Sequence, residues 1–296
     1  MSTAAGAIPR RFELSSTTFR RLAWFTVGML VLIVATGATV RLTGSGLGCE
    51  HWPGCTPSEF LPAQGFHSDI EFGNRVVAAA TVVSTLLLAI ASLLARVPRW
   101  TRVLAWATFV GTLAQAPLGA ITIHYDLNPY LVISHLLLSL LVLGLGVVVA
   151  APGAGAALGV TAQRLALLLL AAVTFLVVTG TLATAAGKFP GSSGDKYVQR
   201  LGTFEPSVAL HVKAVAIFGL VFLAVAYWAW RHRARGLLRG CVGLLAILLG
   251  QMAVGESQYR MYGTIPWWVV LLHVALAATL FAWTVGLAVR VWRPAA

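Results

Sequence analysis

Three histidines stand inside apolar stretches, where a residue that can bind a metal needs a reason to be present. His273 lies within the apolar run 266–280, His135 lies in an earlier run that also follows a proline, and His211 lies near the start of a third. Two imidazoles at matched depth on separate helices of a bundle suit axial ligation of haem iron, whereas zinc would need further ligands. We therefore interpret His211 and His273 as haem ligands. The alternative for each is a hydrogen-bonded packing residue.

A carboxylate, an amide and a guanidinium share one helix face in the second apolar region. Glu71, Asn74 and Arg75 are spaced i, i+3 and i+4, and this spacing allows an ion pair between Glu71 and Arg75. A charged group at this depth is costly unless it has a partner, which makes Glu71 a candidate catalytic residue. The alternative is an ion pair that only anchors the end of the helix.

Two cysteines lie close together in the loop that follows the first apolar stretch. Cys49 and Cys55 are separated by a Pro-Gly step, so the spacing allows the loop to close. A structural staple and a redox role are both consistent with this spacing. A zinc site that includes His51 is a weaker alternative, because the sequence shows no full set of four ligands.

The composition predicts that a lipid bilayer surrounds the elements that carry these residues. Of the 296 residues, 58% are hydrophobic and only 10% are charged, and the mean hydropathy is +0.85. These values exclude an ordinary soluble domain and predict an all-α integral membrane protein. Eight stretches are apolar and long enough to span a bilayer, at 20–41, 72–95, 102–123, 129–150, 163–184, 207–230, 236–254 and 264–290.

The placement of positive charge predicts the orientation. A net charge of +12 would suggest nucleic acid in a soluble chain, but here most arginines fall at one end of the predicted spans, and we expect no nucleic-acid partner. The positive-inside rule then predicts that both termini are cytoplasmic, at the cell (plasma) membrane. The first span lacks a small-residue cleavage signature, so we expect it to be retained.

The chain contains an internal repeat. Residues of the same type recur at a nearly constant offset in four pairs: Thr36 and Thr179, Gln115 and Gln251, Gly119 and Gly255, and His135 and His273. Because each copy holds an even number of spans, we expect two homologous four-helix bundles related by a pseudo-two-fold axis along the membrane normal. The repeat sets Asn74 at the position of His211.

The repeat also divides the chain. We expect a cytoplasmic tail at 1–19, an N-terminal half at 20–150, a linker at 151–162 and a C-terminal half at 163–296. The linker assignment depends on its alanine and glycine content, which breaks the apolar pattern.

Together these features resemble the haem A synthases, which are membrane proteins built from two homologous four-helix halves. The resemblance extends over nearly the whole chain. It is carried by Thr36-Gly37, Arg41-Leu-Thr-Gly-Ser-Gly-Leu-Gly-Cys49, Trp52-Pro-Gly-Cys55, Ile70-Glu71-Phe-Gly-Asn74-Arg75, Leu127-Asn-Pro129 before His135, and the late pair His211 and His273.

The resemblance implies an oxidoreductase that oxidises the C8 methyl group of haem O to a formyl group, which gives haem A for cytochrome oxidase. It implies a haem b cofactor in the C-terminal half, whose iron is held by His211 and His273, and haem O in the N-terminal half at His135. It also implies that Glu71 is essential. The implied partners are haem O, a haem O synthase, an electron acceptor and the bilayer, and a homo-oligomer is left open.

The resemblance further implies that Cys49 and Cys55 form a disulfide connected with turnover. Asn74 departs from the family pattern, which has histidine at this position. Haem O is then held by His135 alone, or with water, His67 or Asn74 on the opposite side. We expect weaker retention of the substrate haem as a result.

Two other functions fit parts of the sequence. A di-haem b electron-transfer protein shares the histidines, and only Glu71 and the cysteine loop argue against it. A transporter fits the parallel repeat and the small residues at helix contacts, but it has no use for paired histidines at matched depth.

Overall fold

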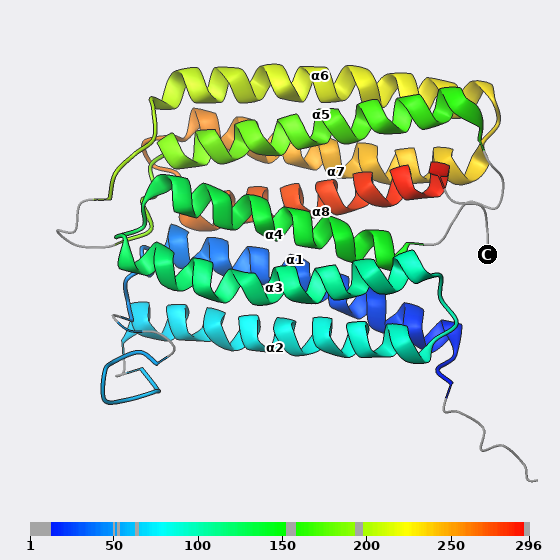
Figure 1. The fold of residues 1–296 in the computed structure, drawn as a ribbon. Coiled ribbons are helices and arrows are strands. Elements are labelled where there is room, and N and C mark those ends of the chain that lie inside the picture. The colour runs from blue at the N-terminus through cyan, green and yellow to red at the C-terminus, as the bar shows by residue number, and fades with distance from the viewer. Residues whose placement is uncertain are drawn as a thin grey trace, which may run out of the picture.

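The computed structural model describes residues 13–49, 51, 54–62, 65–151, 158–192 and 198–292. Within these ranges the chain forms eight long helices (Figure 1). They are α1 Ser16–Leu42, α2 Phe66–Leu94, α3 Arg99–His124, α4 Pro129–Ala150, α5 Gly159–Ala186, α6 Phe204–Arg231, α7 Arg235–Arg260 and α8 Trp267–Trp292. Each is long and apolar enough to cross a membrane, which confirms the predicted all-α, multi-pass class.

The helices pack in two groups of four that follow chain order (Figure 1). Helix α1 packs against α2 and α4, and α3 also packs against α2 and α4; α5 and α7 pack in the same way against α6 and α8. Within the described residues, α2 does not pack against α4, and α6 does not pack against α8, so these pairs are diagonal. Side chains from a diagonal pair can therefore meet only across the interior of their group.

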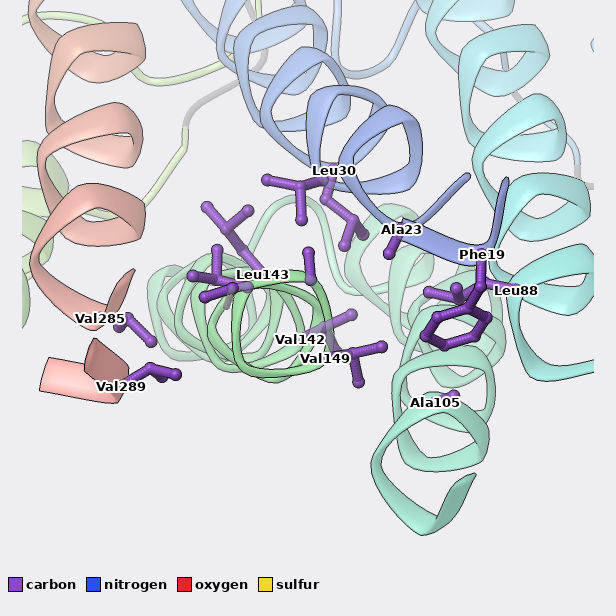
Figure 2. Packing of buried hydrophobic residues seen from close by; sticks show 14 of the residues in the cluster. Phe19, Ala23, Leu30, Leu88, Ala105, Val142, Leu143, Val149, Val285 and Val289 are labelled. Atoms are coloured by element: carbon purple, nitrogen blue, oxygen red, sulfur yellow. The ribbon is translucent and has the colours of Figure 1, made fainter. Parts of the chain in front are cut away.

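Contacts between the groups come from α1, α4, α5 and α8. Buried apolar side chains from both groups form a hydrophobic core there. Figure 2 shows part of it, where Leu143 of α4 lies between Leu30 of α1 and Val285 of α8. Leu143 is fully buried. A Cβ at Gly146 would come within 2.9 Å of a methyl group of Leu30, so this glycine permits the close approach of α1 and α4.

The helices are longer than hydropathy predicts at two polar ends. Helix α2 begins at Phe66 and not at residue 72, and α7 continues to Arg260 and not to residue 254. Hydropathy ends a predicted span at charged residues, but an intrahelical ion pair lets the backbone hydrogen bonds continue. As a result Glu71 lies inside α2, in its second turn.

The ends of α1 and α5 are joined by backbone contacts made by one arginine. Arg41 donates from Nε to the carbonyl of Phe189 at 3.2 Å and from Nη2 to the carbonyl of Thr184 at 3.0 Å. The N–H of Gly46 donates to the carbonyl of Gly191 at 2.7 Å. These bonds hold the loop after α1 against the loop after α5.

The division into two homologous halves and the symmetry axis remain predictions. Residues 1–12 of the predicted tail and 152–157 of the predicted linker lie outside the described residues. Helix α1 already begins at Ser16, within the range predicted as tail, and α5 already begins at Gly159, within the range predicted as linker.

Candidate functional site

The predicted ligand pair of the C-terminal half is brought together. His211 of α6 and His273 of α8 come from diagonal helices, and their ring centroids lie 6.4 Å apart with planes at 76°. Two imidazoles that bind one iron, each through a bond of about 2 Å, have ring centres about 6 Å apart. The separation therefore fits a haem iron between the rings.

A threonine fixes which nitrogen of His211 carries the proton. The hydroxyl of Thr179 donates its only proton to the carbonyl of Leu176 at 2.9 Å, and its oxygen lies 3.2 Å from Nδ1 of His211. The hydroxyl can then only accept from the ring, so Nδ1 carries the proton. This leaves Nε2 of His211 with a free lone pair, the form that binds a metal.

Glycines leave room for both rings. A Cβ at Gly180 would come within 3.1 Å of Cε1 of His211, and a Cβ at Gly255 would come equally close to Cε1 of His273. Gln251 donates from Nε2 to the carbonyl of His273 at 3.1 Å. In the described part of the chain, Nδ1 of His273 and Oε1 of Gln251 are buried without a hydrogen-bond partner.

The N-terminal group repeats this construction around His135 on α4. Gln115 of α3 donates to the carbonyl of His135 at 3.3 Å, and a Cβ at Gly119 would lie 3.6 Å from its Cε1. Nδ1 of His135 and Oε1 of Gln115 are again buried without a partner among the described residues. The start of α4 is fixed by Asn128, whose side chain caps the N–H of Tyr130, with proline next in the chain.

Asn74 of α2 takes the place that His211 takes in the other group. The hydroxyl of Thr36 donates to Oδ1 of Asn74 at 2.8 Å and lies 3.3 Å from the carbonyl of Ile33. Thr36 and Thr179 thus contact the residues at matching positions of α2 and α6. The structure supports the predicted equivalence of Asn74 and His211 at the level of these contacts.

Glu71 lies one turn before Asn74 and is 4% exposed. Its Oε2 accepts from the backbone N–H of Cys49 at 2.9 Å, and its Oε1 accepts from Nη2 of Arg75 at 2.7 Å. Arg75 also donates from Nη1 to the carbonyls of His51 and Gly54, at 2.8 and 2.6 Å. The predicted ion pair is present, and it also ties the cysteine loop to α2.

Cys49 and Cys55 form a disulfide with an S–S distance of 2.03 Å. Both cysteines are buried. Because neither sulfur is then free as a thiolate, the zinc alternative with His51 does not describe this structure.

We expect the unreduced, denatured protein to show one reactive thiol, that of the buried Cys241, because the other two cysteines are joined. Reduction before labelling should expose both loop thiols. Intact-mass analysis after alkylation measures the difference. Labelling of the loop cysteines without reduction would contradict the pairing.

Four histidines lie apart from these sites. His67 is held by Ser45, whose Oγ lies 3.0 Å from its Nδ1. His51 offers its backbone carbonyl to Arg75, and His124 packs edge-on against the neighbouring Tyr125. His232 caps the end of α6.

Sequence reasoning used Thr36, Thr179, Gln115 and Gln251 only to detect the repeat and did not give them a role. The structure places all four against the candidate ligands or their backbone. The repeat carried a signal that could have found them. Residues that recur at nearly the same offset as the histidines are candidates to contact those histidines.

Comparisons with known proteins match part of this chain to one family. Residues 20–67 match the family described as cytochrome oxidase assembly protein (COX15-CtaA). The chain is 35% identical over 108 residues to a protein of Geobacillus thermodenitrificans and 35% identical over 128 residues to one of Bacillus pumilus, both named "Heme A synthase". These matches cover 35% and 41% of this chain, and only 33% and 40% of the relatives' own length.

Proposed function

We propose that this chain belongs to the haem A synthase family, whose members match part of it, and that it oxidises the C8 methyl group of haem O to a formyl group and so makes haem A. The supporting observation is the repeated construction: a paired-imidazole site in one group of helices, and in the other a matching site that has Glu71 one turn away. A plain electron carrier has no need of a buried carboxylate at only one of two matching sites.

The C-terminal site is proposed to hold haem b through His211 and His273. When bound, haem b supplies electron-transfer chemistry whose potential depends on its axial ligands and on the hydrogen bonds behind them. Thr179 holds the ring of His211 in the tautomer that binds iron. Gly180 and Gly255 keep side-chain atoms away from both rings.

The N-terminal site is proposed to hold haem O through His135. With water as the source of the oxygen atom, conversion of a methyl group to a formyl group releases protons and passes electrons to the proposed electron acceptor. A fixed carboxylate in a dry site stabilises the positive charge that develops at the carbon. Glu71 is placed to do this or to accept a proton, because a carboxylate that accepts two hydrogen bonds still has lone pairs free. Arg75 orients it.

The cysteine loop is proposed to lie on the non-cytoplasmic side of the plasma membrane, with both termini cytoplasmic. This orientation follows from the arginines at the opposite ends of the helices, and it puts the Cys49–Cys55 disulfide where disulfides persist. A haem O synthase and an electron acceptor are the proposed partners.

The experiment is expression of the chain with and without a haem O synthase, followed by purification, acid-acetone extraction and chromatography of the pigments. We expect haem b in both preparations and haem A only when haem O is supplied. Haem b with unchanged haem O would support the di-haem electron-transfer protein. Purified protein without a Soret band would support a transporter.

A further inference from the structure

We propose that the N-terminal site binds haem through His135 alone, and that the side-chain amide of Asn74 donates a hydrogen bond to a small neutral molecule on the other side of the iron. The molecule is of the class of water, dioxygen or carbon monoxide. The inference rests on the proposed function, since it requires haem in this half of the protein.

In the bond between Thr36 and Asn74, the hydroxyl is the donor. Thr36 has one hydroxyl proton and two acceptors in reach, Oδ1 of Asn74 at 2.8 Å and the carbonyl of Ile33 at 3.3 Å. The shorter contact takes the proton. At the matching position Thr179 lies 2.9 Å from the carbonyl of Leu176 and 3.2 Å from the ring of His211, so there the order is reversed.

Oδ1 of Asn74 therefore accepts the proton of Thr36, and the amide nitrogen of Asn74 remains available to donate to another group. An amide nitrogen has two N–H donors and no available lone pair, so it cannot replace imidazole as an iron ligand. The side chain is also shorter than histidine by most of a ring. Asn74 therefore ends short of the position that Nε2 of His211 reaches, and it presents a donor to that space.

The matching glycine also lies farther from the side chain of Asn74 than from that of His211. A Cβ at Gly37 would lie 3.9 Å from Oδ1 of Asn74, whereas a Cβ at Gly180 would lie 3.1 Å from the ring of His211. The smaller side chain thus leaves space that the ring fills in the other group. A small molecule can occupy that space and accept a hydrogen bond.

The other two candidate ligands on α2, His67 and Glu71, already have hydrogen-bond partners. His67 precedes Asn74 by seven residues, about 10 Å along the helix axis, and its ring contacts Ser45. Both carboxylate oxygens of Glu71 accept hydrogen bonds from Cys49 and Arg75. His67 is therefore too far along the helix to be the ligand opposite His135, and the carboxylate of Glu71 is held toward Cys49 and Arg75.

The test is carbon monoxide binding to the dithionite-reduced, haem O-loaded protein, followed by its Soret and resonance Raman spectra. We expect one haem to take up carbon monoxide while the haem held by two histidines does not. The signal should disappear in His135→Leu. Asn74→His should give a low-spin, six-coordinate haem, with carbon monoxide affinity at least about tenfold lower because the new ligand must be displaced.

Two further variants distinguish the effect of the Asn74 N–H donor from the effect of the space beside the iron. Asn74→Leu should keep carbon monoxide binding but shift the C–O stretch and speed dioxygen release about two- to tenfold, as expected for one lost hydrogen bond. His211→Asn should make the C-terminal haem bind carbon monoxide as well. A low-spin N-terminal haem that refuses carbon monoxide would overturn this inference and leave the proposed function intact, whereas failure to retain any haem O would overturn both.

Discussion

Replacing His211 or His273 with leucine should remove the low-spin haem b spectrum of the purified protein. The two rings lie edge to face across the interior from α6 and α8, and leucine fills similar space without a lone pair. Loss of an axial ligand should cost more than the roughly 10- to 100-fold in affinity that loss of a second-shell partner costs. The measurement is the reduced-minus-oxidised spectrum per mole of folded protein.

Two controls make this result specific. His135→Leu removes the matching histidine of the other group and should leave the haem b spectrum unchanged. Thr179→Val keeps the shape but loses the hydroxyl that orients His211, and we expect haem b retention to fall by about 10- to 100-fold without disappearing. Undiminished low-spin haem b in both leucine variants would mean that the pair is structural.

The helices and the closeness of His211 to His273 could be predicted from sequence for simple physical reasons. Bilayer-length apolar runs leave little choice of structure, because the backbone must satisfy its own hydrogen bonds in lipid. Histidine is rare in such runs, and His211 and His273 are predicted to lie at the same depth. The helix ends at Phe66 and Arg260 could not be predicted in the same way, since hydropathy does not register that a charge is paired.

The contacts that give the candidate site its detail are non-local, and sequence spacing says nothing of them. The spacing of Glu71 and Arg75 predicts their ion pair, but not that the carboxylate also accepts from the N–H of Cys49, 22 residues earlier. The contacts of Gly180 with His211 and of Gly255 with His273 likewise depend on which faces of α5 and α7 turn inward. The repeat indicates which residues correspond, and only packing shows what each one touches.

Replacing Glu71 with glutamine should abolish haem A formation while the haem b spectrum of the other half stays intact. Glutamine keeps the shape but removes the charge that would stabilise a cationic centre or accept a proton, so we expect conversion of haem O to fall by about 10²- to 10⁴-fold. The measurement is haem A per mole of folded protein, from extracted pigments.

The structure also shows why this variant needs a careful control. Glu71 anchors the cysteine loop in addition to its proposed role in the chemistry, and an amide cannot accept from both Cys49 and Arg75. Arg75→Lys keeps the positive charge beside Glu71 but weakens the bonds to the carbonyls of His51 and Gly54. It therefore perturbs the loop while the carboxylate remains.

If Glu71 acts in the chemistry, Arg75→Lys should retain much more haem A formation than Glu71→Gln, even where both variants loosen the loop to proteolysis. Glu256→Gln is the matched surface control, because Glu256 and Arg260 form an exposed i, i+4 pair, and it should change neither quantity. An anchoring role gives a different pattern: Glu71→Gln and Arg75→Lys would lower protein yield alike, and each folded molecule would still convert haem O. That pattern would mean that Glu71 is not catalytic and that its carboxylate only holds the disulfide loop against α2.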